Sequence, residues 1–346
     1  MILSASMPQR KYLWRPRYCL AKVRSLKDCL RPVCGSSDSS SRRINWLRMD
    51  LTRSLAAQHL KLRAYSPDVL PIALVASMGI VGALWNSHAG LTWQTPIAVA
   101  GVIVIPSVFL VMSVIFSTVY LNRTFAEVTL YFALWAVFPI FGIQLSYLAA
   151  TLDFPLQDTL FTKADVAIGF DWRTWASLAW RYPIFIKVLI WSYQSNLYQP
   201  LGLVMIFSIF GPHGRNREFL SAMAIASIAT IVIAGLLPTF GPNETYGIPS
   251  GWHTVLTELR AGAPGPLPYT GIVSFPSYHA SMAVILTAAT RSNRFVFVAS
   301  SIVNGLMLIA TVPIGYHYLV DLIAGCFSRG RRCMRRSGAQ NVYRRR

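Results

Sequence analysis

The chain has 346 residues, of which 54% are hydrophobic and only 13% are charged. A soluble globular protein has about 25% charged residues, so this composition indicates that much of the surface faces lipid. The formal net charge of +19 would suit a nucleic-acid binder if it were spread over the fold. The positive charge is instead concentrated at the two ends of the chain. Residues 1–66 hold fourteen Lys and Arg against three acids, and residues 328–346 hold eight Arg and no acid.

The two basic flanks enclose a hydrophobic body at 67–327 that is neutral overall. Basic segments beside membrane spans are typical of the cytoplasmic side, where they contact anionic lipid. We therefore predict a flexible cytoplasmic flank at 1–66, a membrane-embedded domain at 67–327 and an Arg-rich cytoplasmic tail at 328–346, with no nucleic-acid partner. The five cysteines lie in or next to the flanks without C-x-x-C spacing, so neither a disulfide framework nor a metal site is predicted.

Apolar runs long enough to cross the hydrocarbon core recur along the body and predict an all-α, polytopic transmembrane helical bundle of about 7–8 segments. The predicted spans lie near 68–86, 97–120, 127–150, 184–210, 217–237, 276–290 and 295–313, and a last, short one begins near Tyr316. This last run stops at Phe327 and Arg-rich sequence follows at once, which indicates a truncated or frame-shifted terminus. Met49 is an alternative start.

The connecting loops sort by charge, which predicts the orientation. The alternate turns at 121–123, 213–217 and 291–294 each carry Arg, whereas the 87–96 loop has no Lys or Arg. The positive-inside rule then predicts both termini in the cytoplasm, in a multi-pass protein of a bacterial-type plasma membrane. Segment 151–182 interleaves charged residues with Trp and Phe and is typical of amphipathic helices in the outer interface. A connecting role for these helices is favoured over a role in substrate entry.

The sixth predicted span opens with Ser274-Phe275-Pro276-Ser277-Tyr278-His279-Ala280. Pro276 suits the first turn of a helix, and the amides near Ser277, Tyr278 and His279 would then lack acceptors within the helix. Together with the positive end of the helix dipole, these amides predict an anion cradle. Ser277 and Tyr278 are therefore candidate phosphate-binding residues, and His279 is placed to give a proton to a phosphate oxygen.

His317 and Asp321 are four residues apart, so on a helix they share one face. Asp321 would fix the tautomer of His317 and leave its other ring nitrogen as a nucleophile. On the residues alone, a structural hydrogen bond and a proton relay remain open as alternatives. The predicted sixth and eighth spans both begin at the outer face, which brings these two residues and His279 to one depth.

A phosphate site also needs cations, and Arg260 is the only Lys or Arg in the predicted outer loop 238–275. It is the candidate for a bidentate phosphate contact, with a solvated loop arginine as the alternative. The other histidines have no such pattern and are predicted to be solvated loop residues: His59, His88, His213 and His253.

The segments around the two candidate histidines, His279 and His317, resemble the second and third motifs of the type 2 phosphatidic acid phosphatase superfamily. Their details are most similar to its inositolphosphotransferase branch, which includes inositol phosphorylceramide synthases. The resemblance covers roughly residues 130–325, with the specific motifs at 258–325. The other segments that resemble this branch are Leu160–Trp172, which contains Asp165, and then Leu237–Pro242 and Leu259–Gly262.

The resemblance implies a metal-independent double displacement without a cofactor. His317 would attack the phosphorus and form a phosphohistidine, Asp321 would orient it, and His279 would protonate the leaving group. The superfamily's phosphatases carry Gly where this chain has Tyr278 and Arg where it has Thr311, and their first motif, a Lys with an Arg-Pro seven residues on, is not visible. Fewer cations favour a phosphodiester over a phosphomonoester dianion, and hence head-group transfer over hydrolysis.

Three functional hypotheses follow from these residues. The first is a membrane-bound phosphotransferase, inositolphosphotransferase-like, that moves a phosphoryl or phospho-head group between lipid substrates. The second is a lipid phosphate phosphatase that hydrolyses phosphatidic acid or an isoprenyl phosphate. The third is a non-enzymatic transporter with a His–Asp proton relay. The candidate polar residues cluster at one face, and the spans lack paired Gly/Pro-broken segments, so an enzyme is favoured.

Overall fold

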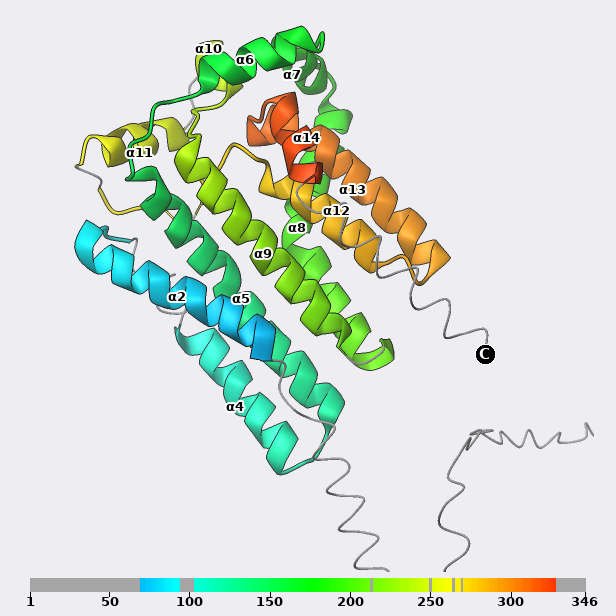
Figure 1. Cartoon of the computed structure of the whole chain (residues 1–346). Helices are drawn as coiled ribbons and strands as arrows, with labels where there is room; N and C mark the ends of the chain where they lie inside the picture. Colours follow the sequence, from blue (N-terminus) through cyan, green and yellow to red (C-terminus); the bar gives the residue numbers. More distant parts are fainter. Residues whose placement is uncertain are drawn as a thin grey trace, which may run out of the picture. The chain divides into compact units, whose positions relative to one another are not determined.

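The computed structural model shows an all-α bundle, and the described residues contain no strand, which confirms the predicted fold class. The described residues are 69–93, 103–211, 214–248, 251–262, 265–268 and 270–327. The predicted flanks at 1–66 and 328–346 lie outside them, as do His59 and His213. Figure 1 shows long helices running side by side, with shorter helices gathered near one end.

Eight helices correspond to the eight predicted membrane segments. They are α2 (Val69–Ala89), α4 (Ile105–Thr118), α5 (Arg123–Ala150), α8 (Pro183–Phe210), α9 (Arg215–Leu236), α12 (Tyr278–Ala289), α13 (Arg294–Gly315) and α14 (Leu319–Phe327). The short helices are α6 (Asp158–Ala167), α7 (Trp172–Arg181), α10 (Pro242–Thr245) and α11 (Gly251–Arg260). The last two lie in the segment predicted as a long outer loop, where buried Leu256 and Leu259 give α11 an apolar face.

Four described helices, α2, α5, α9 and α13, are long and apolar enough to cross a membrane. The predicted span at 184–210 is the 28-residue helix α8, but it is not among the four. Polar residues such as Gln194, Asn196 and Gln199 interrupt its apolar sequence. The predicted sixth and last spans are short helices, as the sequence indicated: α12 has 12 residues and α14 has 9.

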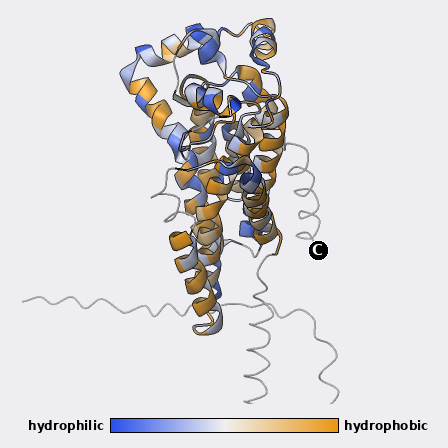
Figure 2. Ribbon diagram, turned by 90° about the vertical axis from the view of Figure 1, so that its left-hand side faces the viewer, coloured by the Kyte–Doolittle hydropathy of each residue, from blue (hydrophilic) through white to orange (hydrophobic). Residues whose placement is uncertain are grey.

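Large apolar side chains lie on the outside of the bundle as well as in its core. Ile184 and Phe295 are 81% and 86% exposed, although both lie in long helices. Figure 2 shows hydrophobic residues along the long helices, while hydrophilic residues are frequent among the short helices at one end. An apolar outer surface is favourable in hydrocarbon but not in water. The bundle is therefore that of an integral membrane protein.

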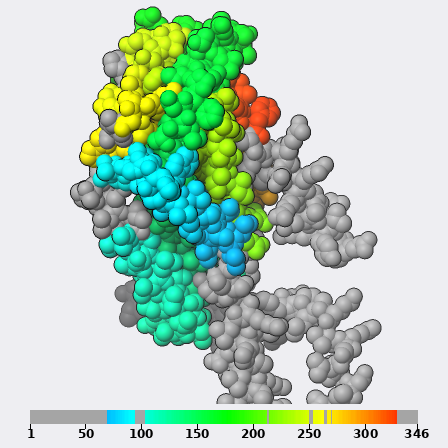
Figure 3. Space-filling view, turned by 60° about the vertical axis from the view of Figure 1, so that its left-hand side comes forward, coloured from blue at the N-terminus to red at the C-terminus, as the bar shows by residue number. Residues whose placement is uncertain are grey.

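The predicted amphipathic segment 151–182 forms the helix pair α6 and α7, as expected. Trp172 at the start of α7 is buried, and its Nε1–H donates to the Val312 carbonyl of α13 at 3.2 Å. The α7 N-terminus is capped by Asp171, whose carboxylate accepts from the Arg173 amide at 3.0 Å. Figure 3 shows this region in green beside the yellow segment that contains α10 and α11. The pair is thus anchored to the bundle.

A buried polar network joins the three helices that carry the candidate site. Asn304 of α13 is 1% exposed, and its side-chain amide donates to Thr287 of α12 at 3.1 Å. Its carbonyl oxygen accepts from Gln199 of α8 at 3.0 Å, and Gln199 also donates to Ser195 at 2.9 Å. Because unpaired amides are costly in a low-dielectric interior, this network fixes how α8, α12 and α13 face one another.

Replacing Asn304 by Ala should lower the thermal unfolding midpoint of the detergent-solubilised protein. The change leaves the Gln199 amide without its partner on α13, at a cost of about 1–3 kcal/mol. Ser301→Ala is the matched control on the same helix, because the Ser301 hydroxyl bonds the Phe297 carbonyl of its own helix. Equal midpoints for the Asn304 variant and the unsubstituted protein would show that the network does not hold the helices.

Candidate active site

His317 lies in a short connection between α13 and α14, not on a helix. Helix α13 ends at Gly315, and Tyr316 adopts a left-handed backbone conformation with φ of 52°, which turns the chain away from the helix axis. A new helix, α14, then begins at Leu319. The prediction that His317 and Asp321 lie on one helix is therefore wrong, because His317 precedes α14. The two side chains nevertheless meet.

The His317 Nδ1 atom lies 3.2 Å from Oδ2 of Asp321. The same carboxylate oxygen accepts from the Ser274 hydroxyl at 3.2 Å and from the Tyr318 amide at 2.9 Å. Asp321 is 0% exposed, and its second oxygen, Oδ1, has no hydrogen-bond partner among the described residues. With Nδ1 engaged by Asp321, the ring nitrogen left for chemistry is Nε2.

Asp165 of α6 holds the beginning of α14. Its two carboxylate oxygens accept from the backbone amides of Leu319 at 2.9 Å and Val320 at 3.0 Å. These amides have no acceptor within their own helix, so a carboxylate from another helix takes the place of a local cap. Burial raises the pKa of Asp165, and the two backbone hydrogen bonds oppose that shift. Asp165 lies in one of the segments that resemble the inositolphosphotransferase branch, but no role was predicted for it.

Asp158, at the first position of α6, fixes the neighbouring segment and the ring of Tyr318. Its carboxylate accepts from the Thr239 hydroxyl and from the backbone amides of Phe240 at 3.1 Å and Gly241 at 2.9 Å. It also accepts from the Tyr318 hydroxyl at 3.1 Å, directly beside His317 in the chain. Helix α6 therefore positions the connection that carries His317 through two carboxylates, one at each end of the helix.

The start of α12 lies directly against α14. The Ser277 amide donates to the Asp321 carbonyl at 3.0 Å, and the Ser281 hydroxyl donates to the Gly325 carbonyl at 2.9 Å. A Cβ atom on Gly325 would lie 2.3 Å from the Ser277 carbonyl oxygen, so only glycine permits this approach. The close contact brings the two candidate histidines, on different segments, to one place.

The anion cradle predicted at this helix start is only partly present. Pro276 precedes the helix, which begins at Tyr278, and Ser277 is the N-cap residue rather than a first-turn residue. The amide of Ser277 is used by Asp321, and its hydroxyl accepts from the Ala280 amide at 3.3 Å. Ser277 is 0% exposed, so its polar groups serve the helix junction. The Tyr278 hydroxyl donates to the Met223 carbonyl of α9 at 3.5 Å.

His279 lies across from His317, with their ring centroids 6.5 Å apart and their planes at 66°. The face of His279 stacks on Tyr193 of α8, with ring centroids 4.1 Å apart and planes at 19°. The structure thus brings His279, His317 and Asp321 together, as the sequence predicted from their common depth. It adds Tyr193, which no sequence pattern indicated.

Arg260 does not join this site. Its guanidinium pairs with Asp153 at 2.7 Å and donates to the Phe154 carbonyl at 3.0 Å, which ties the end of α11 to the connection after α5. Figure 1 shows α11 on the opposite side of α9 from α12 and α14. The prediction that Arg260 contacts the phosphate is therefore not supported, because a nearer acid takes up its charge.

Other residues singled out from the sequence also have structural partners. His253 is not a solvated loop residue, because it lies on α11 with Nε2 3.3 Å from a Glu244 carboxylate oxygen and its ring 4.2 Å from that of Phe240. Thr311, which stands where phosphatases of the resembling family carry Arg, is buried in α13 and donates to the Met307 carbonyl at 2.7 Å. Neither residue supplies a cation to the histidine pair.

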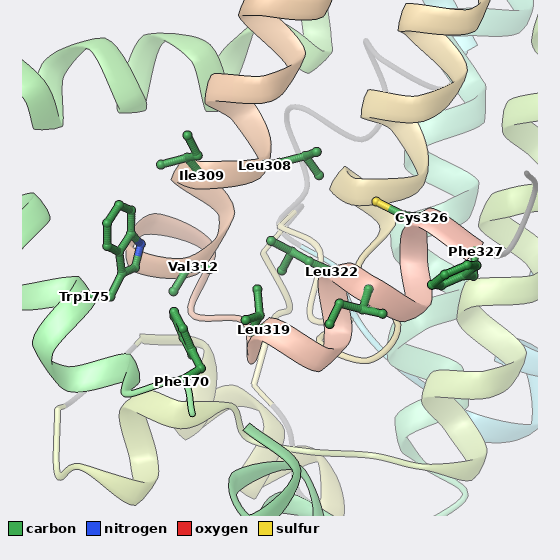
Figure 4. Close-up of a pocket in the computed structure, with 10 residues that line it drawn as sticks. Phe170, Trp175, Leu308, Ile309, Val312, Leu319, Leu322, Cys326 and Phe327 are labelled. Carbon is green, nitrogen blue, oxygen red and sulfur yellow. The ribbon is translucent and has the colours of Figure 1, made fainter. Parts of the chain in front are cut away.

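An apolar groove of about 480 Å³ runs beside the His317 connection, between α7, α13 and α14. Figure 4 shows side chains from these helices and from Phe170 turned into it. The lining consists of Phe170, Trp175, Leu308, Ile309, Val312, Leu319, Leu322, Ile323, Cys326 and Phe327. Leu319 and Leu322 flank Asp321 in the sequence, so the groove adjoins the helix that carries the buried carboxylate.

Comparison of the sequence with protein families gives one match. Residues 159–329 match the family model of the PAP2 superfamily, the type 2 phosphatidic acid phosphatases. The matched region begins in α6 and extends beyond α14, so it contains His279, His317, Asp321 and Asp165 but not Asp158. The match supports assigning this region to the PAP2 superfamily, whose members are generally enzymes that act on phosphate esters. Searches of curated proteins and of solved structures gave no match.

Replacing Asp165 by Asn should loosen the start of α14 without unfolding the bundle. An amide side chain has one acceptor oxygen instead of two, so one of the Leu319 and Val320 amides loses its partner. We expect hydrogen–deuterium exchange at these amides to accelerate by roughly tenfold, the effect of one lost hydrogen bond. Asp171→Asn is the control, because Asp171 caps α7 instead. Unchanged exchange in the Asp165 variant would exclude the capping role.

Proposed function

We propose that the protein is a membrane-bound phosphotransferase that moves a phosphoryl or phospho-head group between lipid substrates, as inositolphosphotransferases do. The observation that carries this proposal is the buried pair of His317 and Asp321 facing His279. Burial lowers the pKa of His317, and a backbone interaction with Ser274 opposes this, so the imidazole is neutral near pH 7. A neutral imidazole with one nitrogen held by a carboxylate is the form in which histidine acts as a nucleophile.

The proposed reaction has two displacements. In the first, which requires His279 to enter as the imidazolium, Nε2 of His317 bonds to phosphorus, the bond from phosphorus to the leaving oxygen breaks, and His279 gives that oxygen a proton and becomes neutral. In the second, His279 takes the proton of an acceptor hydroxyl, whose oxygen bonds to phosphorus and releases His317. In both steps the Asp321 carboxylate accepts a hydrogen bond from Nδ1–H of His317 and stabilises the positive charge on the His317 ring. No step requires a metal or a cofactor.

The apolar groove supports a lipid substrate. It is lined in part by residues of α14, the helix that carries Asp321, and its ten lining residues from Phe170 to Phe327 carry no charge. Burial of a lipid chain there is favourable by about 0.8 kcal/mol for each methylene group. A transporter with a proton relay would not need such a groove, and the superfamily match supports an enzyme instead.

Transfer and hydrolysis differ only in the acceptor, and the described ion pairs of the site favour transfer. No Lys or Arg among the described residues forms a salt bridge with Asp321, which pairs with His317. A phosphodiester carries about one negative charge fewer than a phosphomonoester at neutral pH, where the second phosphate pKa is near 6, and so needs less neutralisation. Lipid phosphate hydrolysis is the second candidate function, because water would fit the same site.

The activity test uses the purified full chain with phosphatidic acid, and separately with phosphatidylinositol and ceramide. We expect head-group exchange in the second assay, and loss of activity by more than about 1000-fold in His317→Ala, since the nucleophile is removed. His253→Ala is the control, because His253 lies on α11 with Glu244 as its partner. Free phosphate from phosphatidic acid without exchange would make the protein a phosphatase. Full activity of His317→Ala would exclude both functions.

We infer that the histidine end faces the outer side of a plasma membrane and that both termini are cytoplasmic. The α12–α13 turn at the opposite end carries Arg291 and Arg294, as cytoplasmic turns do. Contacts of anionic lipid with the basic flanks belong to the same proposal.

A cysteine-free background with single exposed cysteines tests this orientation. Ser177→Cys on α7 should react with a membrane-impermeant maleimide on intact cells. Ser292→Cys in the α12–α13 turn should react only after the membrane is opened, because that turn is expected inside. The reverse labelling pattern would show that the active site faces the cytoplasm.

A further inference from the structure

Tyr193 of α8 is the third ring of the histidine site. Its ring lies flat against His279, with centroids 4.1 Å apart, and it packs with the α8–α13 cluster around Leu189 and Ala310. Its ring is therefore held in place by packing on one side and by the imidazole on the other. The phenol hydroxyl extends beyond this stack.

The Tyr193 hydroxyl and the His317 ring approach the same point, which is Gly315. A Cβ atom built on Gly315 would lie 2.9 Å from Cδ2 of His317 and 3.1 Å from the Tyr193 hydroxyl oxygen. Cδ2 is bonded to Nε2 in the imidazole ring, so the edge of His317 that carries the free nitrogen is turned to the side where the hydroxyl lies. Any side chain at Gly315 would separate the two groups.

The Tyr193 hydroxyl forms no hydrogen bond that stabilises the fold of the described residues. Among the residues that the structure describes, no hydrogen-bond partner of the Tyr193 hydroxyl is found. Phenylalanine would stack on His279 and pack against α13 equally well, and a partly buried hydroxyl without a partner costs free energy. A hydrogen-bond donor at the edge of a phosphate site, in contrast, stabilises charge on the phosphoryl oxygens.

We propose that Tyr193 is a further catalytic residue, whose hydroxyl donates a hydrogen bond to a non-bridging oxygen of the phosphoryl group between His279 and His317. This assignment rests on the proposed function. The hydroxyl keeps its proton through both displacements and stabilises the negative charge that the phosphoryl oxygens carry in the transition state. The Tyr193 hydroxyl would supply part of the charge stabilisation expected of the arginine that phosphatases of the superfamily carry at the position of Thr311.

The test is Tyr193→Phe in the purified full chain, compared with Tyr198→Phe, a control on the same helix whose side chain is 69% exposed. Three quantities are measured: kcat with the preferred lipid substrate, KM, and inhibition by vanadate, which adopts the five-coordinate geometry of phosphoryl transfer. Loss of a hydrogen bond to a charged oxygen should lower kcat about 10- to 100-fold and weaken vanadate inhibition by a similar factor. KM and the thermal unfolding midpoint should stay close to those of the control.

The outcomes separate this proposal from the one on which it rests. Normal kcat and normal vanadate inhibition in Tyr193→Phe, with an inactive His317→Ala, would overturn the role of Tyr193 and leave the proposed function in place. A lower unfolding midpoint with unchanged vanadate inhibition would show a structural role and would also overturn it. Activity in His317→Ala would reject the phosphohistidine function itself.

Discussion

The site depends on one constraint: a carboxylate and an imidazole are buried at a helix junction, where their polar neighbours must be satisfied without water. One oxygen of Asp321, Oδ2, lies within 3.2 Å of the His317 ring, the Ser274 hydroxyl and the Tyr318 amide, so these three groups all find their partner in the same atom. The start of α14 adds two backbone amides, which Asp165 takes up from another helix. Removing either carboxylate would leave buried donors unpaired, which is why the amphipathic helix α6 belongs to the site.

Contacts elsewhere in the bundle fix the positions of α8, α12 and α13 relative to one another. The amide network of Asn304 and Gln199 joins α8 to α13 and α12 well away from the histidines. The missing side chain of Gly325 lets α14 lie against α12. Both features fix distances between segments that are far apart in the sequence. The superfamily match at 159–329 covers α8, α12, α13 and α14, which carry these features.

The apolar runs predicted the helices well, because their length and composition are local properties. The meeting of His317 and Asp321 was predicted from helical spacing, yet the chain achieves it with a turn at Tyr316. Arg260 pairs with Asp153, which the sequence could not predict because the choice of partner depends on tertiary contacts, and its phosphate contact stays a prediction. Asp165 looks like a solvated residue in the sequence, since its acceptor role depends on amides 154 positions away. The catalytic roles themselves stay predictions.

The unpaired Oδ1 atom of Asp321 couples the stability of the fold to the chemistry at His317. A buried carboxylate is least favourable when its partner imidazole is neutral, because only a dipole then offsets the lost hydration. A positive charge on the ring would strengthen its attraction to Asp321. Because burial lowers the pKa of His317, the folded state favours the neutral ring by linkage, and in the proposed reaction Asp321 would offset part of the cost of the charge that forms on the imidazole.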